Sequence, residues 1–278
     1  QPYGEWLSDN LVFLKDLKIP NVAVEEYSYE ESNRLMKAFG YSYEEVKDSV
    51  LPMALNGSEA IGAMGVDTPL AVLSKRHHPL FDYFKQLFAQ VTNPPIDAIR
   101  EEIVTSTSIY VGGEGNVLEE KAENCHVLKI RHAKVKNINV KDVPITYYKG
   151  TPLDKAINHL YVAVDQAHKN GANVVILTDR GVDENHVAIP SLLAVSAVHH
   201  HLIETKKSTS VSIILESGEP REVHHFATLL GYGACAINPY LAQFSIKKLI
   251  QDGLLKKDYY AAVNDYNNAV LHGIVKIA

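Results

Sequence analysis

The chain has 278 residues, of which 46% are hydrophobic, so it can bury the core of one large α/β domain or of two modest ones. Its formal net charge of -6 at pH 7 offers no basic stripe to a nucleic-acid backbone, and we expect no nucleic-acid partner. Charges or histidines interrupt every apolar run before the roughly 20 residues that cross a bilayer, and the first residues lack a signal-peptide pattern, so we expect a cytoplasmic protein with no membrane contact.

The N-terminal part of the chain is predicted to be helical. Ser28 and Glu31, like Ser42 and Glu45, have the capping-box spacing, in which a hydroxyl and a carboxylate satisfy the free amides at a helix start. Gly40 stands between the two boxes and is a natural C-terminal stop for the first helix. We therefore expect two helices here, the second beginning near residue 43.

An aromatic segment, residues 79–91, follows with apolar side chains at helical spacing. The turn Asn93-Pro94-Pro95 ends it. Two interpretations are open: the stripe is an internal packing face, or it is a surface that a neighbouring domain covers. The exit loop, residues 92–100, is a stiff turn suited to positioning a neighbour, and Asn93 and Arg100 are its candidate interdomain residues. The apolar members of the stripe are Leu80, Phe81, Phe84, Leu87, Phe88 and Val91.

From residue 106 to residue 149 the pattern weakens, and we expect loops and short strands that wrap the core or reach a neighbouring domain. The run Gly112-Gly113-Glu114-Gly115 could be taken for a phosphate-binding loop. Its spacing fits neither the dinucleotide fingerprint nor the P-loop, so we interpret it as an ordinary loop. The loop 106–115 is a third candidate for an interdomain surface.

After Pro152 the chain alternates regularly between helical and strand patterns. An amphipathic helix begins near residue 153 and closes at Gly171. Three short apolar segments then read as buried strands, namely residues 174–177, 211–215 and 234–237. Further helices are expected to begin near residues 190 and 220 and to cover residues 241–251 and 258–271. The alternation predicts a parallel sheet with right-handed crossovers.

Polar residues follow two of these strands where the strands end. Asp179 and Arg180 come after the first, and Glu216 comes after the second. The carboxyl ends of parallel strands are where α/β folds place functional groups, so these side chains could hold a small anion. The alternative is that they pair with neighbours or cap the next helix, which is the commoner use of such residues.

The turn Glu216-Ser217-Gly218-Glu219-Pro220 resembles in position the phosphate-gripping turn of flavin-binding barrels. A phosphate grip needs converging backbone amides, whereas this turn brings two carboxylates and a proline without an amide proton. The turn therefore indicates a shared architecture without flavin binding.

Cysteines and histidines give no metal or catalytic signature. Cys125 and Cys235 are expected to be reduced thiols. The histidine clusters at 77–78, 199–201 and 224–225 lack the spacing of a zinc site, because adjacent helical residues point about 100° apart. No G-x-S-x-G elbow is present. We therefore assign no catalytic, cofactor-binding or metal-binding residue.

Several long strings in the sequence are more particular than any general fold pattern requires. They are PYGEWL, RLMKAFGYSYEE, the run GAMGVDTPLAVLSKRHHPLFDYFKQLFAQVTNPPIDAIREE, AIPSLLAVSAVHHHLI and SGEPREVHHFATLLGYGACAINPYLA. Together they resemble the central domain of the large chain of glutamate synthase. The resemblance runs from residue 3 nearly to residue 278, and only residues 117–149 are unspecific.

The resemblance implies a longer parent enzyme. Glutamate synthases join an N-terminal amidotransferase, whose first residue is a nucleophilic Cys, to a C-terminal FMN-binding domain with an iron–sulfur cluster. Here residue 1 is Gln, and two cysteines cannot hold such a cluster. We therefore expect an excised, inactive middle piece of an oxidoreductase, whose partners are the amidotransferase and FMN-binding domains and a small electron-donating subunit or ferredoxin.

The expected fold is α/β, with parallel βα units that form a partial or degenerate TIM-like barrel and a helical N-terminal region. Residues 1–150 would be the helical and loop-rich part, and residues 151–278 the βα part that leads toward the FMN-binding domain. The expected role is to link the two catalytic domains and support ammonia transfer for glutamate synthesis from glutamine and 2-oxoglutarate. The alternative is a stand-alone barrel-like enzyme or regulatory domain that binds a small anion through Asp179, Arg180 and Glu216.

Overall fold

The computed structural model describes residues 2–10, 12–13, 27–62, 65–69, 71–75, 78–88, 95–116, 118–125, 127–129 and 139–278. Its contacts divide the chain into two compact units whose segments alternate along the sequence. Unit 1 comprises Gln1–Glu26, Ser108–Glu216 and Tyr232–Asn238, and unit 2 comprises Tyr27–Thr107, Ser217–Gly231 and Pro239–Ala278. The expected boundary between residues 150 and 151 stays a prediction.

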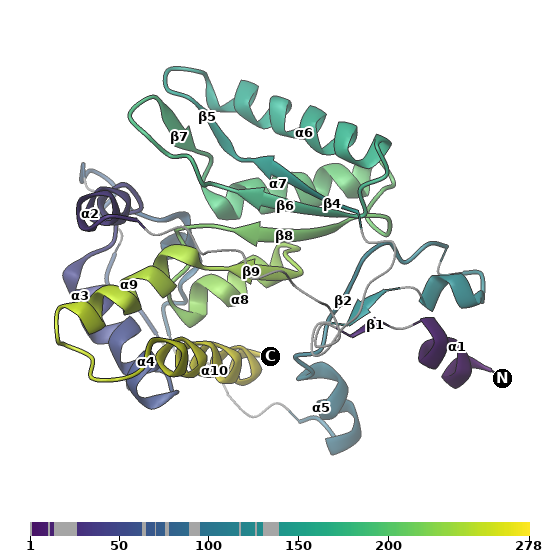
Figure 1. The fold of residues 1–278 in the computed structure, drawn as a ribbon, viewed down its shortest axis with the longest axis horizontal. Coiled ribbons are helices and arrows are strands. Elements are labelled where there is room, and N and C mark those ends of the chain that lie inside the picture. Colours follow the sequence, from purple (N-terminus) through teal and green to yellow (C-terminus); the bar gives the residue numbers. More distant parts are fainter. Residues whose placement is uncertain are drawn as a thin grey trace. The chain divides into compact units, whose positions relative to one another are not determined.

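Unit 1 is built on a parallel sheet of four strands in the order β4-β6-β8-β9, drawn as neighbouring arrows in Figure 1. The strands are β4 (Val140–Pro144), β6 (Val174–Thr178), β8 (Ser212–Glu216) and β9 (Ala236–Asn238). Helix α6 (Leu153–Lys169) packs against β4 and α7 (Ser191–Glu204), and α7 packs against β8. The predicted parallel topology of the three later strands is confirmed. The TIM-like barrel stays a prediction, since the four described strands form an open row.

The edge strands of this sheet depart from the sequence expectations. The sequence of β4, VKDVP, was expected to form loop or short-strand structure, and it joins the main sheet with only Val143 buried. Charged residues and a proline suit a strand whose outer edge has no ladder partner among the described residues. Residues 234–237 were predicted to be a buried strand; Ala234 is buried, whereas Ala236 and Ile237 of β9 are half-buried, because an edge strand is covered less completely.

Smaller elements complete unit 1. β5 (Thr146–Tyr148) and β7 (His186–Ala188) form an antiparallel pair, and β1 (Val12–Phe13), β3 (Leu128–Lys129) and β2 (Tyr110–Val111) form a small mixed sheet. Helix α1 (Tyr3–Asn10) packs against the 3-10 turn η4 (Ala122–Cys125). The expected loops and short strands between residues 106 and 149 are thus present where the structure describes them.

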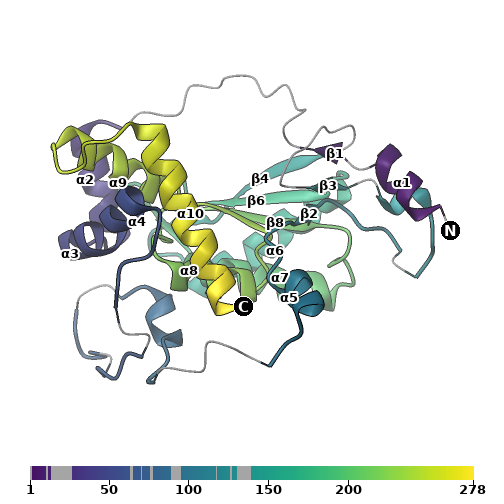
Figure 2. The ribbon, with the colours of Figure 1, turned by 90° about the horizontal axis from the view of Figure 1, so that it is seen from below.

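Unit 2 is mainly helical. Helix α10 packs against α4, α8 and α9, as Figure 2 shows for the yellow helix, and α2 packs against α9. Its elements are α2 (Tyr29–Ala38), α3 (Tyr43–Glu45), the π-helical turn η2 (Val46–Val50), α4 (Leu51–Asn56), the 3-10 turn η3 (Leu80–Phe84), α5 (Ala98–Val104), α8 (Val223–Gly231), α9 (Tyr240–Gln251) and α10 (Tyr259–Ile277). Among the described residues, no helix has the length and apolar character needed to cross a bilayer.

Both predicted capping boxes are confirmed. The Ser28 amide donates to the Glu31 carboxylate at 2.9 Å while the Ser28 hydroxyl accepts from the Glu31 amide at 3.3 Å. The corresponding distances at Ser42 and Glu45 are 2.7 and 3.1 Å. Gly40 adopts a left-handed φ of 68° just after α2, as expected of a helix stop.

The helical prediction for residues 79–91 is wrong in its described part. Only the 3-10 turn η3 forms, and the chain becomes extended at Lys85. Phe81 is fully buried, whereas Leu87 and Phe88 are 69% and 68% exposed. The internal packing face is therefore limited to Phe81 and its neighbours, and residues 89–91 lie outside the described part.

A close contact between α8 and α10 fixes the packing of unit 2. Gly273 of α10 is buried against Val223, and a Cβ at Gly273 would lie 2.5 Å from a Val223 methyl carbon. Replacing a mid-helix glycine by alanine normally stabilises a helix by about 1 kcal/mol. Here the backbone position has no room for a methyl group.

We predict that Gly273→Ala lowers the free energy of unfolding by about 1–2 kcal/mol, because overpacking outweighs helix propensity. Adding Val223→Ala should remove the clash, so that the double variant is more stable than Val223→Ala alone. Urea unfolding followed by circular dichroism measures both effects. Asn267→Ala, on the exposed face of α10, is the control. A more stable Gly273→Ala protein would contradict the prediction.

Candidate functional site

The polar residues predicted at the strand ends of unit 1 do lie together. Glu216, at the end of β8, accepts from Arg180 Nε at 2.8 Å and from Asn238 Nδ2 at 3.2 Å on one oxygen. Its other oxygen accepts from the Thr178 hydroxyl at 2.8 Å. The Asp179 amide donates to the Glu216 carbonyl at 3.2 Å, and the Asp179 side chain is buried. The prediction that Asp179 and Glu216 share one end of the sheet is confirmed.

This strand-end cluster is an internally neutralised network. Both oxygens of Glu216 have donors, and the guanidinium of Arg180 is paired with that carboxylate. Arg180 and Glu216 remain about a quarter exposed, so the ion pair itself contributes little to stability. The arrangement favours the interpretation as ion pair and cap. A small-anion site at these residues stays a prediction.

Of the two candidate interdomain residues, the structure describes only Arg100. Asn93 lies outside the described residues. Arg100 lies exposed in the first turn of α5, where its backbone amide donates to the Asp97 carboxylate at 3.0 Å. Asp97 also accepts from the Ile99 amide at 3.1 Å and so caps the helix.

The turn that follows β8 is buried in unit 2. Ser217, Gly218 and Glu219 are all buried, and the Gly218 carbonyl accepts from the Tyr41 hydroxyl at 2.9 Å. A Cβ at Gly218 would lie 2.7 Å from the ring of Phe39. An aromatic ring thus packs directly on the glycine that a phosphate grip would need to keep open. The residues of this turn do not fit a flavin phosphate.

Arg221, which directly follows this turn, is a buried residue with many polar contacts. Its side chain is 2% exposed, donates to the Glu45 carboxylate at 2.9 and 3.2 Å, and lies over the Tyr41 ring at 4.3 Å. It also donates to three backbone carbonyls, those of Phe39 and Gly40 at 3.2 Å and of Glu219 at 3.1 Å. The Arg221 carbonyl accepts from the buried Tyr266 hydroxyl at 3.0 Å.

The charge of Arg221 controls its carboxylate partner. Partial burial by itself would raise the pKa of Glu45, but the guanidinium of Arg221 and the Ser42 amide outweigh it and hold that pKa below its ordinary value. Glu45 therefore stays ionised at neutral pH. Further hydrogen bonds support the ion pair, from the Ser42 amide to Glu45 and from Arg221 to three backbone carbonyls.

A second buried network lies at the start of α8. The Arg221 amide donates to Nδ1 of His225 at 3.3 Å, so Nε2 carries the proton and donates to Glu222 at 3.1 Å. Lys85 pairs with the same Glu222 at 3.0 Å. The His225 ring stacks on Phe81 with 4.4 Å between centroids. These contacts anchor the segment around η3 to α8.

The pKa values in this network follow from burial and pairing. Burial lowers the pKa of His225, and the donation to Glu222 only partly opposes it, so the imidazole is neutral. Burial would raise the pKa of Glu222, but His225 and Lys85 outweigh it and hold that pKa far below its ordinary value. Sequence reasoning missed Arg221 and His225 as organising residues. The one sequence feature that could have indicated them is the position of an arginine and two histidines just after the turn that follows β8.

Three other histidines have local partners. His224 bonds the Phe81 carbonyl at 2.9 Å, His200 bonds the Ser196 carbonyl at 2.8 Å, and His201 bonds Asp165 at 3.1 Å. Within the described ranges no group of three His, Cys, Asp or Glu residues could hold a metal ion. Cys125 and Cys235 are both free thiols.

Comparison with known proteins gives a consistent result. The family described as the glutamate synthase central domain matches residues 34–278. The chain is 42% identical over 287 residues to the glutamate synthase (NADPH) large chain of Bacillus subtilis. The aligned region covers 99% of this chain and 19% of that protein. It is 38% identical over 312 residues to the glutamate synthase (NADH) of Saccharomyces cerevisiae, with coverage of 100% and 14%. It is 37% identical over 305 residues to the ferredoxin-dependent glutamate synthase 2 of Synechocystis, with coverage of 99% and 19%. The chain therefore spans less than a fifth of the length of these relatives.

We predict that Arg221→Met lowers the free energy of unfolding by about 3 kcal/mol or more, because it leaves buried carbonyls without a hydrogen-bond donor and Glu45 without its cation. Glu45→Gln keeps the side-chain shape and should cost about 1–2 kcal/mol. The double variant should lose less than the sum of the two, since both remove one ion pair. Arg180→Met is the matched control, because this arginine is about a quarter exposed and its loss should cost less than about 1 kcal/mol. Equal losses for Arg221→Met and Arg180→Met in urea unfolding would contradict the buried role.

A pH dependence follows from His225. The pKa of His225 in the folded protein lies below its ordinary 6.5. Below pH 6.5 this histidine is therefore protonated in the unfolded chain while it is still neutral in the folded one. We therefore expect stability to fall with decreasing pH by up to about 1.4 kcal/mol per pH unit from this residue. Glu222 acts in the same direction at more acidic pH, below its ordinary 4.5.

His225→Gln removes this titration while keeping a donor for Glu222. Urea unfolding of both proteins between pH 5 and pH 7.5 should give a shallower slope for the variant, and the other histidines cancel in the comparison. His159→Gln, on the exposed face of α6, is the control and should leave the slope unchanged. Identical slopes for His225→Gln and the unsubstituted protein would show that His225 is not held neutral.

Proposed function

The chain belongs to the glutamate synthase central-domain family, and from this premise we propose that it connects the catalytic domains of a longer glutamate synthase. In that enzyme glutamine is hydrolysed at an amidotransferase site, and the ammonia travels internally to a second site. There it combines with 2-oxoglutarate, and reduction yields glutamate. The contribution of this domain is geometric, because it fixes the separation of two sites between which ammonia must be kept from water.

The observation that carries the linking role is an anchored, exposed apolar segment in unit 2, residues 83–88. Tyr83, Phe84, Leu87 and Phe88 are exposed within six residues. Soluble proteins rarely leave so many large apolar side chains together in water unless another surface covers them. The segment is also fixed in place, since Phe81 stacks on the buried His225 and Lys85 pairs with Glu222. An anchored apolar segment suits contact with a neighbouring domain of the same chain.

The cofactors are proposed to lie in the rest of the parent enzyme. The packed Gly218 and the paired Arg221 support placing FMN outside this chain, and two separate cysteines support the same for the iron–sulfur cluster. We propose that this chain catalyses neither step by itself. The electron donor is set elsewhere, because relatives named for NADPH, NADH and ferredoxin are similarly close, at 42%, 38% and 37% identity.

The alternative of a stand-alone enzyme or regulatory domain gains no support from the strand ends. A small anion there would have to compete with Glu216 for the guanidinium of Arg180. The proposed role is accordingly the connecting one, with the amidotransferase and FMN-binding domains as partners in the cytoplasm.

The test is made in the full-length parent enzyme, where glutamine hydrolysed and glutamate formed are measured together. We expect Leu87→Ser with Phe88→Ser, and separately Asn93→Ala with Arg100→Ala, to uncouple the two, so that more glutamine is hydrolysed per glutamate formed. Glutaminase activity should remain measurable, because the hydrolysis site lies in another domain.

Val162→Ser is the matched control, since Val162 lies on α6 of unit 1 with the same 68% exposure as Phe88. It should leave the coupling ratio unchanged. An unchanged ratio in the Leu87 and Phe88 variant, with the fold intact by circular dichroism, would count against the segment as a domain contact. Uncoupling by Val162→Ser to the same extent would also do so.

A further inference from the structure

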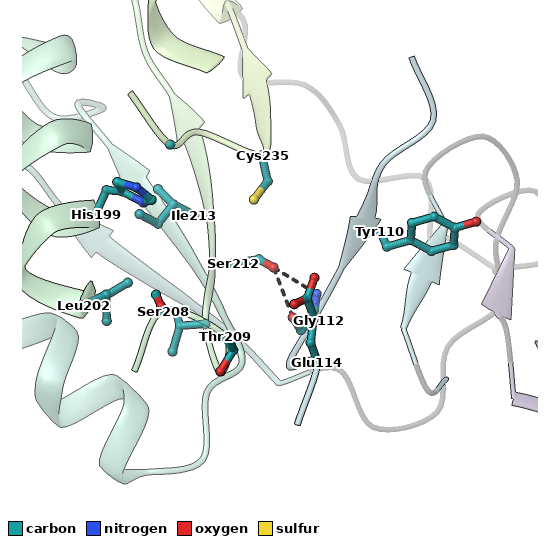
Figure 3. Close-up of a pocket in the computed structure, with 12 residues that line it drawn as sticks. Tyr110, Gly112, Glu114, His199, Leu202, Ser208, Thr209, Ser212, Ile213 and Cys235 are labelled. Atoms are coloured by element: carbon teal, nitrogen blue, oxygen red, sulfur yellow. Dashed lines mark hydrogen bonds between the residues drawn. The ribbon is translucent and has the colours of Figure 1, made fainter. Parts of the chain in front are cut away.

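Unit 1 contains a small cavity at the amino ends of its sheet, the edge opposite the cluster around Glu216. It lies where β8 begins and where Cys235 precedes β9, and its volume is about 170 Å³. A cavity of roughly 150 Å³ is enough to hold benzene. Figure 3 shows the side chains around it, with the Cys235 sulfur pointing toward Ser212. None of the contacts described above uses this space.

The walls of the cavity are held by backbone contacts. The Ser212 hydroxyl accepts from the Gly112 amide at 3.0 Å and donates to the Gly112 carbonyl at 3.2 Å, drawn as dashed lines in Figure 3. The Glu114 amide donates to the Thr209 carbonyl at 2.8 Å. Gly233, at a φ of 107°, packs so closely that a Cβ would lie 2.5 Å from the His199 ring. The cavity is therefore a built feature of these loops.

Three polar side chains around this cavity have no hydrogen-bond or ion-pair partner within the described part of the chain. They are the Glu114 carboxylate, the His199 imidazole and the Cys235 thiol. Burial and the neighbouring His200 lower the pKa of His199, so its imidazole is neutral at pH 7 and can accept as well as donate. Leu202 and Ile213 supply an apolar wall.

The charged residues that line the cavity indicate which class of ligand it would bind. Among the described residues that line the cavity there is no lysine or arginine, and Glu114 is the one acidic residue. Phosphates and carboxylates would meet a carboxylate with no compensating cation and are excluded. A protonated amine gains the attraction of Glu114 and donates hydrogen bonds to an imidazole or hydroxyl, while a short hydrocarbon body covers the apolar wall.

We propose that this cavity is a binding site for a small primary ammonium compound of about six non-hydrogen atoms or fewer, with its nitrogen at Glu114 and its hydrocarbon part against Leu202 and Ile213. The site is independent of the connecting role. Its occupant covers the Cys235 thiol, which gives a direct measure of binding.

The test uses three probes of nearly equal shape: isobutylamine, isobutanol and isobutyrate. Each is added to the protein at pH 7 before brief exposure to iodoacetamide, and alkylation of each cysteine is measured by mass spectrometry of the peptides. We expect isobutylamine to protect Cys235 at the lowest concentration and isobutyrate not to protect it. Cys125, in η4 and outside the cavity, is the internal reference and should react equally in every sample.

Glu114→Gln keeps the shape of the cavity and removes its charge. It should weaken protection by isobutylamine by about fivefold, the size expected for one ion pair at an exposed carboxylate, and leave isobutanol unaffected. Glu204→Gln, on the exposed last turn of α7, is the matched control and should change neither. Saturation-transfer NMR on the same samples detects binding without the thiol.

Four outcomes would overturn the proposal. They are equal protection by all three probes, equal protection of Cys125, unchanged protection in Glu114→Gln, and a Cys235 that iodoacetamide modifies only in urea. The last would show that the cavity is closed to small molecules.

Discussion

Unit 2 depends on one buried guanidinium. Arg221 joins residues that are about 180 positions apart in the sequence, because its donors are shared among Glu45 and the carbonyls that end α2. Burying a cation without partners would be costly, so the end of α2, the Glu45 carboxylate and the Glu219 carbonyl must all be in place together.

The turn after β8 also bears on the proposal that this chain holds no flavin. In the sequence the turn resembles a phosphate grip, and its carboxylates argue against one. In the structure Phe39 closes on Gly218, and the nearest arginine faces Glu45 and backbone carbonyls. The groups that could have met an anion are used to hold unit 2 together. Their role is structural, which agrees with a domain whose proposed task is to keep two other domains in position.

The sequence predicted those features whose interacting residues are close together in the chain, and it failed where the partners are far apart. Ser28 with Glu31, and the apolar run that became β6, are local patterns, and both were predicted correctly. β4 was missed as part of the main sheet because an edge strand may carry Lys141 and Pro144 without penalty, so its sequence reads as a loop. The spacing of residues 79–91 predicted a helix, but Lys85 instead leaves the 3-10 turn to pair with Glu222. Arg221 and the cavity near Cys235 could not be predicted, since their partners come from segments far apart in the sequence.

The alternation of the two units along the chain also has a consequence for biosynthesis. The helices around Glu45 leave the ribosome well before Arg221, a polar partner that comes 176 residues later. At a synthesis rate of about 5–20 residues per second, these helices wait roughly 9–35 s before that partner emerges. Unit 2 is completed only when α10 follows. During that interval the nascent chain exposes the surfaces of α2 and α4 that it later buries, and this is the period in which a chaperone would protect it most.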